Sequence, residues 1–420
     1  MQVTSRGLIR VFIWLISLGG FFYQTGTMLR IYFEYPFSVS VVEKLHKGIM
    51  FPAVTICLEN WIDRSAYCSL DEHADALPIE QVNESKLQEM EYDFEAQKKI
   101  SVSPADVFEC SLSSTDPTCA AFTCTGNIRR TYFRHPKHMC YTLDPEQYQS
   151  SISRHGFSKC RSPWTWELSL IVHWITKHTI AINDTGKFPV IVHRPQTCPP
   201  DKLSSVVGDA GSSYVLSVTQ QTVNRLPPPY ESKCTDYVKE GRQPAFGGFM
   251  NQDTCLQKCH MTLEVKHCGC ADPRHEFASS FGTKLCVVEE AEKCVSRLLQ
   301  NRTFKNCEVR CRAPCRETTY DVRMTGMGVA NVRECRLFGL KIKFASDSQK
   351  IFLYQPNLTA SIRSIVEAFG YLGGYLGMWL GFSLLSILKS LQRKLFDFLS
   401  STATVRRIVA PKYVISILLS

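Results

Sequence analysis

Two long apolar segments lie near the two ends of the chain. The first runs from Val11 to Leu29 and the second from Ala368 to Leu388, and neither contains a charged residue. At about 1.5 Å of rise per residue, each is long enough to cross the ~30 Å hydrocarbon core of a bilayer as a helix. The pattern predicts a transmembrane helix near each end, with a large folded domain between them.

Basic residues beside these segments predict their orientation. Arg6 and Arg10 precede the first segment, and Lys389, Arg393 and Lys394 follow the second. Because basic residues favour the cytoplasmic side, both termini are expected inside the cell. A cleaved signal peptide is the alternative for the first segment, but no small-x-small cleavage site follows it, which favours a retained helix. The predicted divisions are a cytoplasmic N-terminus at 1–10, helices at 11–31 and 363–388, an extracellular domain at 32–362 and a cytoplasmic tail at 389–420.

The pattern between the two segments is mixed and indicates an α+β domain. Apolar runs at 188–192 and 214–218 predict strands, and apolar residues alternate with lysine over 340–344 as in a half-buried strand. Residues 80–99 are charged and compatible with a helix, whereas 106–140 are interpreted as loop-like.

Glycines line one face of the second apolar segment. They are spaced three and four residues apart, which places them on the same side of a helix. A face without side chains lets another helix approach closely, and it leaves backbone carbonyls accessible where the helix unwinds. The stripe alone favours helix packing over a pore. Its members are Gly370, Gly373, Gly374, Gly377 and Gly381.

Cysteines and glycosylation sequons concentrate between the two apolar segments. The chain has 19 cysteines, and 18 of them lie from Cys68 to Cys335. So many cysteines are typical of an oxidising compartment, where they pair as disulfides. Four Asn-x-Ser/Thr sequons lie in the same region, at Asn83, Asn183, Asn301 and Asn357. Both features indicate an extracellular, glycosylated domain.

The densest group of cysteines runs from Cys234 to Cys315. Two pairs are four residues apart, at 255/259 and 307/311, so each pair lies on one face of a helix. Two antiparallel helices would then be joined by two rungs. The rungs expected are Cys255–Cys311 and Cys259–Cys307, with Cys234–Cys315 closing the outer loop.

Four further cysteines in this group suit a smaller crosslinked loop. They are Cys268, Cys270, Cys286 and Cys294, and their spacing does not fix the pairing. A metal site built on the HCGC sequence at 267–270 is the alternative, which an oxidising compartment disfavours. We therefore expect disulfides and no metal here.

Charge and motifs exclude several classes of function. A formal net charge of +9 over 420 residues is modest and the basic residues are scattered, so no nucleic-acid partner is predicted. The sequence contains no nucleophile elbow, metal-ligand helix motif or phosphate loop, which argues against an enzyme and against a cofactor.

Several motifs resemble the degenerin/epithelial sodium channel family, which includes the acid-sensing ion channels. FPAVTIC at 51–57 is similar to the signature after the first helix, and MCYTL at 139–143 to a Cys-Tyr-Thr element. LPPPY at 226–230 and the ladder ending in CEVRCRAPCRETTY at 307–320 are similar to the family's thumb. Gly-Phe-Ser at 381–383 matches its Gly-x-Ser selectivity motif. The resemblance covers nearly the whole chain.

The resemblance implies a sodium channel subunit of the plasma membrane, commonly blocked by amiloride. Such a subunit carries palm, finger, knuckle, β-ball and thumb outside two transmembrane helices that contact membrane lipid. It assembles as a homo- or heterotrimer, and sodium is the permeant ion rather than a cofactor. The family's disulfide pattern agrees with the ladder and adds Cys268–Cys294 and Cys270–Cys286. The partners of Cys57, Cys68, Cys110, Cys119, Cys124, Cys140, Cys160, Cys198 and Cys335 are not predicted.

The resemblance also assigns roles to single positions. Gly381, Phe382 and Ser383 would form the selectivity constriction, where backbone carbonyls meet a partly dehydrated ion. Gly370 would stand near the gate, beside the other glycines of the stripe, and Tyr230 at the wrist, close to the first helix.

The chain departs from the family at several points. The His-Gly gating motif that many members carry is absent or truncated in MQVTSRG, and Lys389 stands where a Glu is usual. A cation at the inner mouth repels sodium, so a non-conducting accessory subunit of a heterotrimer is one alternative. A disulfide-rich surface receptor with a single anchor is the other. No acidic cluster supports acid gating, and the sequence does not identify an extracellular stimulus or ligand.

Overall fold

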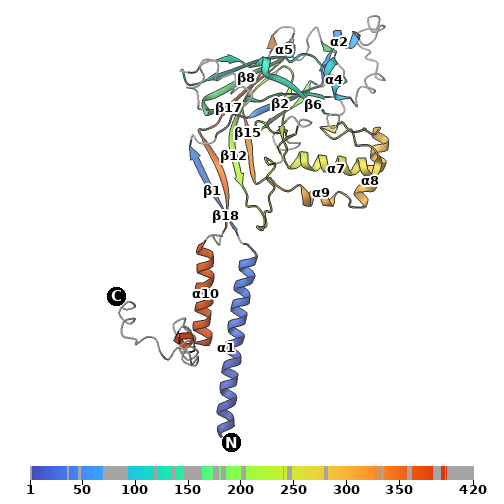
Figure 1. Cartoon of the computed structure of the whole chain (residues 1–420). Coiled ribbons are helices and arrows are strands. Elements are labelled where there is room, and N and C mark those ends of the chain that lie inside the picture. The colour runs from blue at the N-terminus through green and yellow to red at the C-terminus, as the bar shows by residue number, and fades with distance from the viewer. Residues whose placement is uncertain are drawn as a thin grey trace, which may run out of the picture. The chain divides into compact units, whose positions relative to one another are not determined.

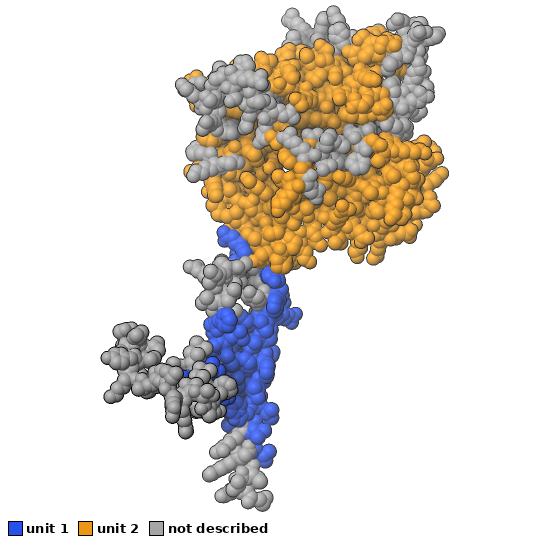
Figure 2. Space-filling model, in the orientation of Figure 1, with its two compact units in different colours: residues 1–38, 355–420 blue, residues 39–354 orange. Residues whose placement is uncertain are grey.

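The chain folds into two compact units in the computed structural model (Figure 2). Unit 1 comprises residues 1–38 and 355–420, and unit 2 comprises residues 39–354. The structure describes residues 2–35, 37–45, 49–69, 93–117, 119, 121–134, 138–145, 163–173, 179–180, 186–199, 205–239, 241–243, 248–278, 282–329, 331–332, 335–356, 362–381, 389–392 and 394.

The described part of unit 1 contains helices α1 (Gln2–Phe33) and α10 (Ile362–Leu380), drawn in blue and red in Figure 1. Within the described residues, one helical segment, Val11–Arg30, is long and apolar enough to cross a membrane. Helix α1 begins before the predicted position 11 and ends after 31. Helix α10 ends at Leu380, where Gly381 takes the left-handed conformation with a φ of 66°, and the rest of the predicted segment, 382–388, lies outside the described residues.

Nine described strands form one sheet, in the order β1-β18-β12-β17-β8-β4-β5. Strand β15 also pairs with β12, and β16 with β17. The strands are β1 (Phe37–Leu45), β4 (Phe108–Ser114), β5 (Phe122–Thr123), β8 (Trp166–His173), β12 (Ser212–Asn224), β15 (Arg316–Val329), β16 (Asn331–Val332), β17 (Cys335–Phe344) and β18 (Ser348–Pro356).

Strand β12 connects distant parts of the chain within this sheet. It pairs antiparallel with β15 and parallel with both β17 and β18. Leu216 of β12 is in register with Ile342 of β17, and both side chains are buried. The two strands predicted at 214–218 and 340–344 are therefore direct neighbours.

A second sheet has five strands in the order β11-β10-β2-β7-β6. Strand β2 lies at its centre, and all of its residues are buried because both of its faces are covered. The strands are β2 (Ala53–Leu58), β6 (Ile128–Arg134), β7 (His138–Leu143), β10 (Lys187–His193) and β11 (Ser205–Asp209).

The main hydrophobic core lies between the two sheets. Phe188 of β10 meets Phe338 of β17 edge to face with ring centroids 4.7 Å apart, and Phe108 of β4 lies 5.2 Å from Tyr141 of β7. All four rings are almost completely buried. Burial of such large apolar side chains is the main stabilising term for this part of the molecule.

Helices α7 (Gln252–Cys268), α8 (Val288–Gln300) and α9 (Lys305–Arg310) lie together beside the sheets (Figure 1). We call residues 251–315 the α7–α9 subdomain. The remaining elements are short: α2 (Arg64–Ser69), α4 (Phe94–Ile100), α5 (Pro104–Val107), 3-10 turns at Thr125–Asn127 and Pro163–Thr165, and the strand pairs β3 (Ile62–Asp63) with β9 (Thr179–Ile180) and β13 (Arg242–Gln243) with β14 (Gly248–Phe249). The predicted α+β class is confirmed.

The loop-like interpretation of residues 106–140 was wrong. Strands β4, β6 and β7 occupy much of this stretch, and Phe108, Cys110 and Leu112 alternate into the core. The cysteines obscured that alternation, because disulfide-bonded cysteine is itself a buried apolar residue in a strand. The predicted helix at 80–99 is described only from Asp93, whose side chain caps α4 by accepting from Glu95 N at 2.9 Å.

Candidate functional site

The two helices of unit 1 pack along matching faces. Their half-buried residues recur every three or four positions, so each set lies on one helical face. Four of the six residues on the α1 face are small or polar, which allows close helix approach in a membrane. The α1 set is Ser17, Gly20, Phe21, Gln24, Thr25 and Met28, and the α10 set is Leu372, Tyr375, Leu376, Trp379 and Leu380.

A single indole makes the most specific contact between these helices. Trp379 Nε1 donates a hydrogen bond to Gln24 Oε1 at 2.8 Å. Its ring lies so close to Gly20 that a Cβ built at that glycine would stand 2.6 Å from ring atoms. Gly20 is therefore the small residue on which the close approach of α1 and α10 depends.

The glycine stripe of α10 faces the other way. At about 100° per residue, Gly370, Gly374 and Gly377 lie on the side of the helix opposite Trp379. These glycines and Gly373 are exposed. A Cβ at Gly370, Gly373 or Gly374 would meet nothing within 4 Å among the described residues. Within this chain, the stripe is thus not the surface that packs against α1.

Helix α10 ends where the Gly-Phe-Ser motif begins. Gly381 is exposed with a φ of 66°, and its N–H bonds to Gly377 O at 3.2 Å. This is the usual way a glycine terminates a helix. The helix itself then supplies no donor to the carbonyls of Met378, Trp379 and Leu380, and a helix C-terminus carries partial negative charge.

The level of this helix end within the apolar span follows from the indole contact. Gly20, under the Trp379 ring, is at the middle of the 20-residue span Val11–Arg30. Trp379 precedes Gly381 by two residues, which is about 3 Å along a helix. The end of α10 is therefore level with the middle of the apolar span of α1.

The other predicted positions near this helix end are only partly described. Phe382 and Ser383 lie outside the described residues. Lys389 is described, and it is exposed in a helical stretch at 389–392. The structure thus presents Gly381 and Lys389 as accessible groups of unit 1.

The cysteine ladder is present in the α7–α9 subdomain. Helix α7 begins at a capping box between Asn251 and Thr254 and ends at Gly269, whose φ is 79°. Its cysteines join α9 and the residues after it, with Cα atoms 5.6 and 5.8 Å apart for the two rungs. The pairs are Cys255–Cys311, Cys259–Cys307 and Cys234–Cys315, the same pairs that the spacing suggested.

The smaller loop is closed by Cys268–Cys294 and Cys270–Cys286, as the resemblance implied. Both sulfurs of the HCGC sequence are thus occupied, which removes the ligands that a metal site would need. Two further disulfides, Cys57–Cys140 and Cys110–Cys124, were not predicted. Cys119 is also disulfide-bonded, Cys68 and Cys198 are thiols, and Cys160 and the side chain of Cys335 are not described.

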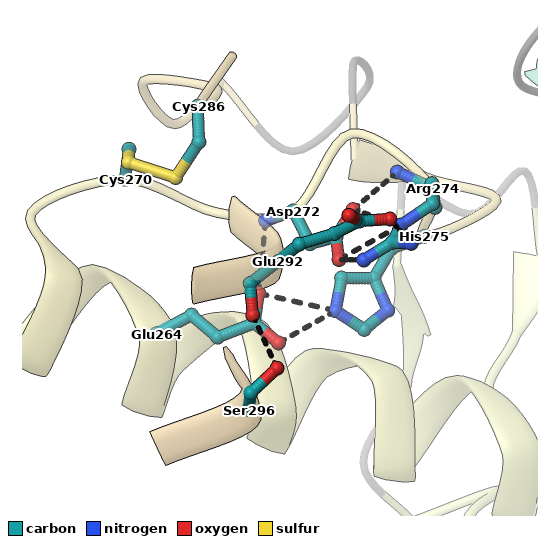
Figure 3. A network of polar contacts seen from close by, with 8 residues as sticks. All are labelled: Glu264, Cys270, Asp272, Arg274, His275, Cys286, Glu292 and Ser296. Atoms are coloured by element: carbon teal, nitrogen blue, oxygen red, sulfur yellow. Dashed lines mark hydrogen bonds and ion pairs between the residues drawn. A yellow bond between two sulfur atoms is a disulfide. The ribbon is translucent and has the colours of Figure 1, made fainter. Parts of the chain in front are cut away.

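A polar network fixes this crosslinked loop to the helices (Figure 3). Glu264 of α7 is buried and accepts from Asp272 N at 2.9 Å and from His275 Nε2 at 3.0 Å. Asp272 pairs with Arg274 at 2.7 Å, and Arg274 reaches Glu292 of α8 at 2.9 Å. The chain of contacts therefore joins α7, the loop and α8.

Burial and charge act in opposite directions on this network. Burial alone would raise the pKa of Asp272, but hydrogen bonds from Arg274 and its charge hold that pKa below its usual value. The bond to Asp272 in turn raises the pKa of Arg274. Nearby, burial and the neighbouring His275 lower the pKa of His260. These shifts favour a charged Asp272–Arg274 pair at neutral pH.

A second buried polar chain crosses four strands of the five-stranded sheet. His193 Nδ1 donates to Arg194 O at 3.0 Å, so the other nitrogen, Nε2, accepts from the Thr55 hydroxyl at 2.9 Å. Thr55 contacts Thr142 at 2.7 Å, and Thr142 contacts Thr131 at 2.9 Å. Burial lowers the pKa of His193 to about 4, so the ring is neutral in the folded protein.

Two predicted surface positions are also described. Tyr230 lies in a turn of unit 2, where its N–H bonds to Pro227 O at 3.3 Å and its carbonyl accepts from Lys233 N at 3.0 Å. Its predicted place beside the first helix stays a prediction. Asn301 is exposed at the end of α8, whereas Asn83, Asn183 and Asn357 lie outside the described residues.

The contact between Gly20, Gln24 and Trp379 was missed from the sequence. One signal was present, because Gln24 is a polar residue inside an apolar run, and such residues usually face a partner. Nothing in the sequence indicated which residue that partner is.

Comparison with known proteins gives one family. Residues 3–390 match the family model described as amiloride-sensitive sodium channel. The chain is 24% identical over 215 residues to degenerin-like protein unc-105 of Caenorhabditis elegans, a match that covers 47% of this chain and 23% of that protein. It is 23% identical over 193 residues to degenerin del-1 of the same organism, covering 43% of this chain and 27% of that protein. The chain thus spans about a quarter of the length of these curated relatives.

Among solved structures, the chain is similar to one titled as a cryo-EM structure of a proton-activated chloride channel. The sequences are 5% identical and the TM-score is 0.36, with 93% of this chain and 98% of that chain covered.

Proposed function

This chain belongs to the amiloride-sensitive sodium channel family, and we propose that it is a channel subunit whose α10 lines a sodium-conducting pore. The family is one of ion channels and not of enzymes. In this proposal, Gly381, Phe382 and Ser383 form the selectivity constriction, and the stripe from Gly370 to Gly377 lines the outer pore near the gate. Amiloride blocks the current, an extracellular stimulus opens the pore, and both termini are cytoplasmic.

The observation that carries the proposal is the end of α10 at the middle of the apolar span. Backbone that leaves a helix at this depth is tolerated only where it is buried in protein or borders water. Gly381 is not buried within this chain, so water or another subunit would lie beside it. Carbonyls at a helix C-terminus suit a cation, as in other membrane proteins that bind ions at broken helices.

Assembly follows from the free glycine face. One α10 cannot enclose a pore, whereas several copies arranged around an axis can place their glycine faces toward its centre. We propose a homo- or heterotrimer in the plasma membrane, with α1 on the lipid side. Chemical crosslinking of the purified protein tests the number of subunits, because a trimer gives a product of three times the chain mass.

The direct test is a current recording from cells that express the chain, alone and with related subunits. We expect an inward current that disappears when external sodium is replaced by a large organic cation and that amiloride reduces. Surface biotinylation checks that the protein reaches the membrane. A chain that reaches the surface and carries no current with any related subunit would contradict the proposal.

Lys389 favours a second candidate, a non-conducting accessory subunit. Its exposed ammonium follows the constriction in sequence, where it would repel sodium. If it limits permeation, Lys389→Glu raises the current of the chain expressed alone. Lys394→Glu is the matched control, because Lys394 is also exposed and lies farther along the chain. Equal currents for all three chains would place Lys389 away from the ion path.

The surface-receptor alternative makes a different prediction for the mature N-terminus. Cleavage of the first apolar segment would remove Gly20 and Gln24, and with them the contacts of Trp379. N-terminal sequencing of the mature protein decides between the two, since a pore subunit keeps α1.

A further inference from the structure

The contact between Trp379, Gln24 and Gly20 has two independent parts. The indole N–H donates to the Gln24 side chain at 2.8 Å, and the indole ring fills the space that a side chain at Gly20 would occupy. We call this set of three residues the indole clamp. One part is a directional polar bond and the other is a steric fit, so together they define both the height and the rotation of α10 against α1.

The polar half of the clamp is costly to leave unmade. Gln24 and the indole N–H lie within an apolar span, where water is not available to replace a lost partner. A glutamine and a tryptophan that bond to each other across two helices are therefore held in one arrangement. Neighbouring α1 positions show the contrast, since a Cβ at Gly19 or Gly26 would meet nothing within 4 Å.

The indole clamp holds α10 at its C-terminal end, next to the proposed constriction. Trp379 is in the last turn of the helix, two residues before the left-handed Gly381, and on the side opposite the glycine face. Fixing the indole against α1 therefore fixes the direction in which the last carbonyls of α10 point. A rotation of α10 by one residue, about 100°, would turn its glycine face away from the axis of the pore.

We propose that the indole clamp sets the geometry of the ion constriction. Trp379, Gln24 and Gly20 are positioning residues that do not contact the ion themselves. The inference rests on the proposed function, because it requires that ions pass the end of α10. It adds that the selectivity of the pore depends on a contact with α1, on the side of α10 that faces away from the ions.

Three variants break the clamp in different ways. Trp379→Phe keeps an aromatic ring but removes the donor, Gln24→Leu removes the acceptor with little change in volume, and Gly20→Ala pushes the ring away. We expect each to lower the sodium-to-potassium permeability ratio by about threefold, the factor that corresponds to one typical hydrogen bond between membrane helices. The double variant Trp379→Phe/Gln24→Leu should show the same ratio as the single variants, because both remove one bond.

Matched controls are present in the same helices. Trp14→Phe matches Trp379→Phe at an exposed position of α1. Gly19→Ala matches Gly20→Ala at a neighbouring glycine, where an added Cβ has space. Both controls should keep the ratio of the original protein. Reversal potentials in mixed sodium and potassium solutions give the ratio independently of the number of channels at the surface, so a fall in expression does not imitate the effect.

The outcomes separate the inference from the proposed function. If the unmodified chain carries no current at the surface, the proposed function fails. If it conducts and the clamp variants keep its permeability ratio, only the inference fails. Should a clamp variant not reach the surface, the Gln24→Cys/Trp379→Cys pair keeps the test open, because a short bifunctional thiol reagent must bridge the gap that the two longer side chains span, and that crosslink must preserve the selectivity. A pair that does not crosslink, or a crosslinked channel with a changed ratio, overturns the clamp.

Discussion

His193 shows how burial changes the chemistry of one side chain. The ring is buried in the five-stranded sheet with both nitrogens bonded, one to Arg194 O and one to Thr55. A charged ring would lose the bond that Nε2 accepts and would lie in an environment of low polarity. Its pKa is therefore lowered to about 4, and folding excludes a proton that the unfolded chain would bind.

Acid is expected to destabilise unit 2 through His193. The unfolded chain protonates this group near pH 6.5, whereas the folded chain does so only near pH 4. The stability that the neutral ring contributes is complete above pH 6.5 and is lost as the pH falls from 6.5 to 4. The loss reaches about 3 kcal/mol at pH 4. Thermal unfolding of the purified protein between pH 7 and pH 4 measures it.

His193→Gln should flatten this pH dependence, although it also lowers the stability at pH 7. His267→Gln is the control, because that ring is exposed in the last turn of α7. A slope between pH 6.5 and 4 that is the same for His193→Gln and the original protein would assign the acid sensitivity to other groups.

Asp272 should also lose its stabilising contribution in acid, but at a lower pH than His193. Its folded pKa is lowered, so the stability it contributes is present above its ordinary pKa and is lost as the pH falls through the lowered value. Asp272→Asn is expected to cost about 2 kcal/mol at pH 7, since a charged hydrogen-bonded pair is lost, and less at pH 3. Asp236→Asn, in an exposed pair with Lys239, should cost little at either pH. An equal cost for Asp272→Asn at both pH values would contradict this account.

At the scale of elements, two adjacent disulfides, the rungs of the ladder, hold α9 against α7. Helix α9 has only six residues, Lys305–Arg310, which is too short to be stable alone. Its position depends on the rungs at Cys307 and Cys311. Because the rungs are one helical turn apart, either one alone still closes nearly the same loop of the unfolded chain.

Removal of the rungs is therefore expected to be strongly non-additive. Replacing Cys255 and Cys311 by serine, with the other rung intact, should cost less than about 2 kcal/mol, and removing both rungs about 4 kcal/mol. Thermal unfolding under non-reducing conditions gives both values. Cys68→Ser is the control, since this thiol forms no disulfide and should leave the midpoint unchanged. Additive costs would show that each rung acts independently.

At the scale of the whole molecule, the sequence was informative where a regular period was visible. The alternation over 340–344 predicted β17, and the spacing of four predicted the rungs, because strand and helix periods place side chains on one face. The sequence did not predict which surface each face packs against. The glycine stripe favoured helix packing, yet the contact with α1 is made by Trp379 on the other side of α10. Gln24 and Trp379 are 355 residues apart, and no local pattern encodes such a pairing.

The orientation of the chain in the membrane gives the last prediction. Residues 39–354 are expected outside the cell and both termini inside, because the disulfides need an oxidising side and the basic flanks a cytoplasmic one. Asn301 is exposed at the end of α8, so its sequon is accessible to the glycosylation machinery. Glycosidase treatment should reduce the apparent mass of the protein, and Asn301→Gln should remove part of that shift. An N-terminal tag should be detected by antibody only after permeabilisation, and detection on intact cells would reverse the assigned orientation of α1.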